Sequence, residues 1–73
     1  MLKPTSEELR NYADENQLLA AFRRAQADLY ELTAREAAAG ITEETPEFLR
    51  LNQAVIDAGK RLPKGLKHLR KGI

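Results

Sequence analysis

The chain has no cysteine, no tryptophan and a single histidine, His68. The absence of cysteine excludes a disulfide framework and a thiolate metal site, and it is compatible with a reducing cytoplasm. The residues beside His68 are basic or apolar, so they do not supply the carboxylates that a zinc site with one histidine would need. We therefore expect no metal and no other cofactor.

Long apolar runs and β-strand patterns are also missing. No apolar stretch of the sequence approaches the roughly 20 residues of a membrane span. The N-terminal segment MLKPTSEELR lacks the basic region, apolar stretch and small-residue cleavage site of a signal peptide. Aromatic residues make up 5% of the chain, and no β-branched run alternates with period two, which disfavours a β-sandwich. These absences predict an all-α, cytoplasmic protein without a membrane span.

At 73 residues the chain is one small domain, of a size at which folding buries little surface. Domains this small are often completed by a disulfide, a metal ion or a second subunit. Because the first two are not expected here, we expect the chain to associate with itself.

The longest amphipathic stretch runs from residue 18 to residue 39, LLAAFRRAQADLYELTAREAAA. One seam recurs in it at alternating spacings of four and three: Leu18, Phe22, Ala25, Leu29, Leu32, Glu36 and Ala39. This heptad spacing keeps one side of a helix facing a partner helix. The stretch therefore predicts a helix with a single apolar face that another helix must cover.

Capping signals predict where this first helix begins and ends. Thr5 to Glu8 form a capping pattern, so the helix can begin at Ser6. A second capping pattern over residues 14–17 leaves two alternatives, a continuous helix from Ser6 to about Ala39 or a short helix that breaks near Asp14. Gly40 ends the helix as a left-handed cap residue, with the apolar side chain after it folding back in a Schellman-type motif.

A second helix is predicted from Pro46 to Leu62, with Thr45 as its cap and proline at its first position. Its seam again alternates spacings of four and three: Phe48, Asn52, Val55, Gly59 and Leu62. A short connection between two helices predicts an antiparallel hairpin. We expect its core to be led by Leu18, Phe22, Leu29, Leu32, Phe48, Val55 and Ile56.

Two helices cannot hide all of these apolar side chains between them. We expect the remaining ones to form a partner interface: Leu19, Tyr30, Leu49, Leu51 and Ile56. Two hairpins that pair through this surface would make a four-helix bundle, which predicts a homodimer with two-fold symmetry.

Charge is divided unevenly along the chain. Residues 1–59 carry eleven acidic and six basic side chains, a net charge of −5, whereas residues 60–73 carry six basic side chains and no acid. These six cations are Lys60, Arg61, Lys64, Lys67, Arg70 and Lys71. We divide the chain into a helical hairpin domain, residues 1–62, and a basic tail, residues 63–73. Leu62 and the apolar residues of the tail follow spacings of four, three and four, which predicts a basic amphipathic helix: Leu62, Leu66, Leu69 and Ile73.

The sequence of the basic tail is compatible with four roles. It can bind the phosphates of RNA or DNA, lie on a membrane surface, dock its leucines in a groove of another protein, or pack those leucines on its own hairpin. The acidic residues gather at the predicted helix starts, where the helix dipole accounts for them, so we expect no catalysis and no small-molecule substrate. We expect a small regulatory or accessory protein that contacts nucleic acid through the tail; the alternative is a protein-binding adaptor, inhibitor or co-chaperone.

Overall fold

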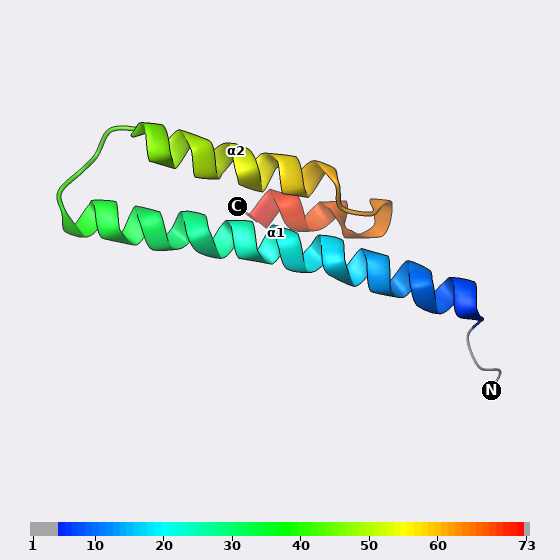
Figure 1. The fold of residues 1–73 in the computed structure, drawn as a ribbon. Helices are drawn as coiled ribbons and strands as arrows, with labels where there is room; N and C mark the ends of the chain where they lie inside the picture. Colours follow the sequence, from blue (N-terminus) through cyan, green and yellow to red (C-terminus); the bar gives the residue numbers. More distant parts are fainter. Residues whose placement is uncertain (1–4, 73) are drawn as a thin grey trace.

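The computed structural model describes residues 5–72 and consists of three helical elements. These are α1 (Ser6–Ala38), α2 (Pro46–Lys60) and the 3₁₀ helix η1 (Lys64–Gly72), and residues 5–72 contain no strand. Figure 1 shows α2 folded back alongside α1, so that the two helices run antiparallel. The predicted all-α hairpin is therefore confirmed.

The first helix is continuous, which decides between the two alternatives for its N-terminal part. The amide of Glu8 donates a hydrogen bond of 3.1 Å to the hydroxyl oxygen of Thr5, so Thr5 caps the helix as predicted. The second capping pattern, residues 14–17, lies inside α1 and starts no new helix.

Helix α1 ends in the predicted Schellman motif. Gly40 has φ +76°, the left-handed conformation that glycine adopts without a steric penalty. The amide of Ile41 donates to the carbonyl of Glu36 at 2.9 Å, and the amide of Gly40 donates to the carbonyl of Ala37 at 3.1 Å. These two bonds satisfy carbonyls that the helix end would otherwise leave free.

Thr45 joins the start of α2 to the end of α1. Its hydroxyl oxygen accepts a hydrogen bond of 3.1 Å from the amide of Phe48, which is the predicted cap of α2. The same hydroxyl donates to a carboxylate oxygen of Glu36 at 2.6 Å. One side chain therefore caps the second helix and ties it to the first.

The core lies between α1 and α2 and centres on Phe22, whose side chain is fully buried. Of the seven predicted core residues, four are buried: Phe22, Leu29, Leu32 and Val55. Leu18 and Phe48 are partly buried. The prediction for Ile56 was wrong, since 42% of its surface is exposed. It follows Val55 by one residue, about 100° around the helix, so it turns away when Val55 faces α1.

Helix α1 is much longer than the element that covers it. Its 33 residues span about 50 Å and the 15 residues of α2 about 22 Å, at 1.5 Å per residue. The N-terminal part of α1 therefore projects beyond the hairpin in Figure 1, and every side chain of residues 5–17 is exposed. We call residues 6–17 the overhang.

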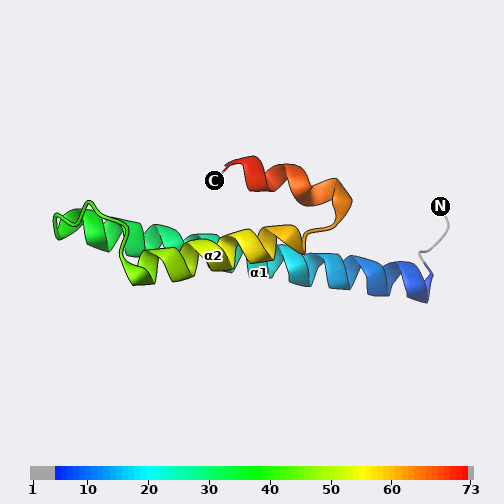
Figure 2. The same cartoon turned by 90° about the horizontal axis from the view of Figure 1, so that it is seen from above.

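Beyond α2 the chain turns back as η1. Figure 1 shows η1 overlapping the hairpin, and the perpendicular view in Figure 2 shows it displaced to one side of the two long helices. The amide of Leu66 donates to the carbonyl of Pro63 at 2.8 Å, an i to i+3 hydrogen bond that starts the 3₁₀ geometry. The predicted tail helix is thus present but more tightly wound than an α-helix. The predicted apolar residue Ile73 lies outside the described residues.

Candidate nucleic-acid interface

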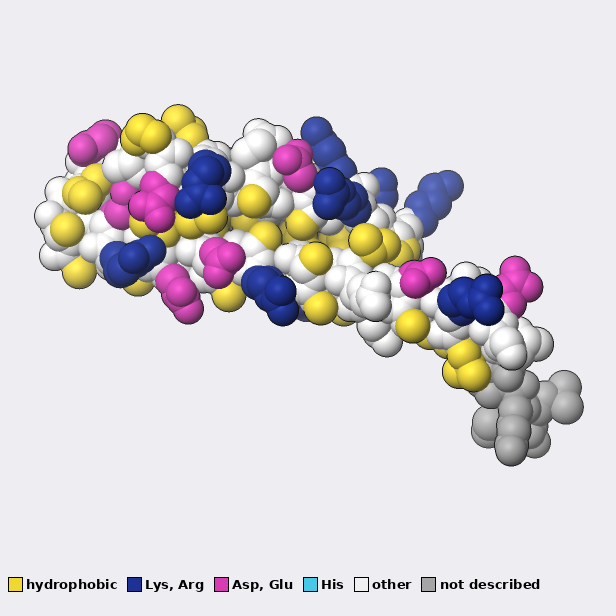
Figure 3. All heavy atoms as spheres, viewed as in Figure 1, with side chains coloured by type: hydrophobic (Ala, Val, Ile, Leu, Met, Phe, Trp, Pro, Cys, Tyr) yellow, Lys and Arg dark blue, Asp and Glu magenta, His cyan; other side chains and the backbone are white. Residues whose placement is uncertain are grey.

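Four of the six predicted cations are exposed where α2 ends and η1 begins. Lys60 is the last residue of α2 and Arg61 is its cap, while Lys64 and Lys67 belong to η1. Figure 3 shows Lys and Arg side chains gathered at the end of the hairpin from which α1 projects. We call these four residues the basic end. The side chains of Arg70 and Lys71 lie outside the described part of the chain.

The leucines of η1 face the hairpin. Leu66 and Leu69 are partly buried and pack against the core cluster of Phe22, Val55 and Leu62. While these leucines anchor η1, Lys64 and Lys67 are exposed to solvent. The same packing leaves the leucines unavailable for insertion into a membrane or into a groove of another protein, unless η1 first detaches.

The cations of the basic end have no ionic partner among the described residues. Among residues 5–69, whose side chains the structure describes, the one salt bridge joins Arg50 and Glu47, with 3.9 Å between the guanidinium nitrogen and the carboxylate oxygen. Both of those side chains are exposed, and such surface pairs contribute little stability. The positive charge of the basic end is therefore available to an external anion.

The five residues of the predicted partner interface differ in their exposure to solvent. Tyr30, Leu49 and Ile56 are exposed, at 52%, 49% and 42%. Leu19 and Leu51 instead pack against the core cluster and are partly buried. The apolar surface that these positions offer to a partner is narrower than the sequence suggested.

The overhang adds two exposed apolar residues that the sequence-based interface did not include. Leu9 and Tyr12 are each 56% exposed. Their exposure follows from the unequal lengths of α1 and α2, which the sequence already contains as the difference between the two predicted helices. That difference was the signal for an uncovered helix segment.

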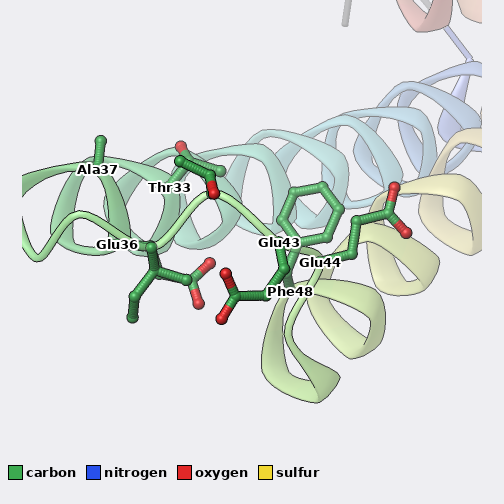
Figure 4. Close-up of a pocket in the computed structure, with 8 residues that line it drawn as sticks. Thr33, Glu36, Ala37, Glu43, Glu44 and Phe48 are labelled. Carbon is green, nitrogen blue, oxygen red and sulfur yellow. The ribbon is translucent and has the colours of Figure 1, made fainter.

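An open pocket of about 180 Å³ lies at the closed end of the hairpin. Figure 4 shows side chains from the last turns of α1, the connecting loop and the first turn of α2 around it. The lining residues are Thr33, Glu36, Ala37, Ile41, Thr42, Glu43, Glu44 and Phe48. The described residues contain no group of three or more His, Cys, Asp or Glu side chains placed to hold a metal ion. With three glutamates in its lining, this end of the hairpin repels a polyanion, in contrast to the basic end.

Comparison of the chain with protein-family models, with curated proteins and with solved structures gives no match. Among the described residues, no helix has both the length and the apolar character needed to cross a membrane.

Proposed function

We propose that this protein is a small, non-catalytic, cytoplasmic accessory protein that contacts the phosphate backbone of RNA or DNA through its basic end. The observation that supports this proposal best is the orientation of η1. The leucines of η1 pack against the hairpin. Lys64 and Lys67 are exposed, as are Lys60 and Arg61 at the end of α2.

The charge distribution of the whole chain favours one mode of approach. Residues 1–59 carry a net charge of −5, and the last fourteen residues carry six cations without an acid. A polyanion is repelled by the body and attracted to the basic end, and this steering raises its association rate at low salt. Each phosphate contact also releases condensed counterions, so the affinity falls steeply as salt is added.

The contact is expected to tolerate any base sequence. Reading bases requires Asn, Gln or Arg side chains held by an element that enters a groove. The basic end consists instead of a helix terminus, a turn and a short 3₁₀ helix, and three of its four side chains are lysines. Phosphate contacts of this kind position a protein on nucleic acid without specifying a sequence.

Binding of labelled single-stranded and duplex oligonucleotides at 50 and 200 mM salt tests this proposal. The informative variant replaces Lys60, Arg61, Lys64 and Lys67 with glutamine. Its matched control removes the same number of charges from exposed positions of α1 by replacing Arg10, Arg23, Arg24 and Arg35 with glutamine. We expect salt-sensitive binding that the first variant loses and the control retains. No binding by the wild-type protein at 50 mM salt, or equal losses in both variants, would contradict the proposal.

A second candidate function, the adaptor or homodimer, is favoured by the exposure of Tyr30, Leu49 and Ile56. Leu49 and Ile56 are seven residues apart and so lie on one face of α2. Two hairpins joined through this face would form the four-helix bundle. Sedimentation equilibrium at micromolar concentration tests self-association. A wild-type dimer that becomes a monomer on Ile56→Lys substitution would support the homodimer. A monomeric wild-type protein would contradict the homodimer and favour a different protein as the partner of this face.

A further inference from the structure

The 3₁₀ geometry of η1 arranges its side chains in three straight ridges. A 3₁₀ helix has 3.0 residues per turn and a rise of about 2.0 Å, so residues three apart lie directly above one another, about 6 Å apart. Leu66 and Leu69 share the ridge that packs against the core. Lys64 and Lys67 share a second ridge, and both are exposed. The backbone position of residue 70, an arginine, continues this second ridge.

An α-helix would not produce this row. At 3.6 residues per turn, a step of three residues falls about 60° short of a full turn, so cations spaced by three fan out around the helix. The tail's apolar spacing of four, three and four suits that α-helical repeat. In the folded protein η1 is wound more tightly, which places Leu66 and Leu69 on one line against the hairpin. The same winding places Lys64 and Lys67 on one line facing solvent.

We propose that this row, Lys64 and Lys67, binds neighbouring phosphates of one polynucleotide strand. The inference rests on the proposed function and specifies how the basic end holds its ligand. The backbone positions of the row are about 6 Å apart, a distance similar to the separation of neighbouring phosphates along a strand. Each ammonium group can therefore pair with its own phosphate, and the strand runs parallel to the axis of η1.

The row predicts that the spacing of the cations affects binding in addition to their number. Lysine ammonium groups act as point charges with freely rotating donors, so a phosphate is held by position rather than by a planar fork of donors. A cation moved to another ridge contributes the same net charge but no longer points at the strand. His68, one residue after Lys67, lies on such a ridge, about 120° away, and is exposed.

The experiment exchanges the residues at 67 and 68, so that Lys67→His is combined with His68→Lys. The exchange keeps the amino-acid composition, and therefore the formal net charge, unchanged. Binding of oligo(U), oligo(dT) and a duplex of equal length is measured over 50–200 mM salt, with Lys67→Arg as the control that keeps a cation in the row. Far-UV circular dichroism confirms that both variants are folded.

We expect the exchange to weaken binding roughly eightfold at 50 mM salt and to lower the salt slope by about 0.7 on single strands, the contribution of one phosphate contact. Lys67→Arg should bind as the wild-type protein does. If the exchanged variant binds with unchanged affinity and slope while the fourfold glutamine variant fails to bind, the row is refuted and the proposed function stands. If the wild-type protein binds none of the three probes at 50 mM salt, both are refuted.

Discussion

Replacing Phe22 with alanine removes the one aromatic side chain that the fold buries completely. Phe22 lies in the core cluster with Leu29, Val55 and Leu62, so the substitution leaves a cavity that both long helices line. Phe→Ala changes at such sites cost about 3–5 kcal/mol, which combines the lost burial with the cavity. A 73-residue domain is expected to have a total stability of about 4–11 kcal/mol. The variant should therefore lose between about a quarter and all of its stability.

Urea unfolding followed by circular dichroism at 222 nm measures this loss. The matched control is Leu9→Ala on the overhang, where a side chain of similar apolar character is 56% exposed and the change should cost less than about 0.5 kcal/mol. If Phe22→Ala costs less than 1 kcal/mol, the packing of α2 and η1 around Phe22 is not the source of the protein's stability. A loss at Leu9 comparable to the loss at Phe22 would mean that the overhang is covered in solution.

Three further changes test the local structure by the same unfolding assay. Thr45→Val removes the cap of α2 and the hydrogen bond to Glu36 and should cost about 1–2 kcal/mol, whereas Thr45→Ser keeps the hydroxyl and most of the stability; equal losses in the two would refute the role of the hydroxyl. Gly40→Ala should cost about 1–2 kcal/mol because φ is +76°, although an added methyl group meets no neighbour; a neutral effect would contradict the left-handed cap. Val55→Ala should cost about 2 kcal/mol and Ile56→Ala less than half as much, and the reverse order would restore Ile56 to the core.

Features set by neighbouring residues were predictable from the sequence. The caps at Thr5 and Thr45, the Schellman motif at Gly40 and the buried seam from Phe22 to Leu32 depend on residues within about one heptad of each other. The order of residues along the chain contains this information directly. The antiparallel hairpin then follows from the short connection.

Features that depend on distant packing were not predictable in the same way. The exposure of Ile56 depends on which side of α2 faces α1. The sequence did not define this rotation of α2 closely, because Leu49, Leu51 and Ile56 flank the predicted seam. The winding of η1 departs from its α-helical apolar spacing. Two local features disfavour an α-helix here, since Pro63 has no amide hydrogen and Gly65 has a low helix propensity. The 3₁₀ winding also allows Leu66 and Leu69, three residues apart, to pack together on the hairpin.

The candidate site also combines features that were predictable from the sequence with features that depend on packing. The sequence located the basic end through its uneven charge, which needs no structure to detect. The direction in which its cations point follows from the docking of Leu66 and Leu69, which only the folded chain contains. The exposure of Leu9 and Tyr12 on the overhang, by contrast, could have been inferred from the sequence, because the first predicted helix is much longer than the second.

Backbone amide shifts on titration with oligo(U) test the central claim most directly, because they identify the bound surface without any substitution. On isotope-labelled protein at 50 mM salt, we expect the shifts to be concentrated in residues 60–69, with residues 7–35 of α1 little changed and the shifts reversed on addition of salt. Shifts centred on Tyr30, Leu49 and Ile56, or no shifts at all, would contradict the assignment of the basic end as the nucleic-acid interface.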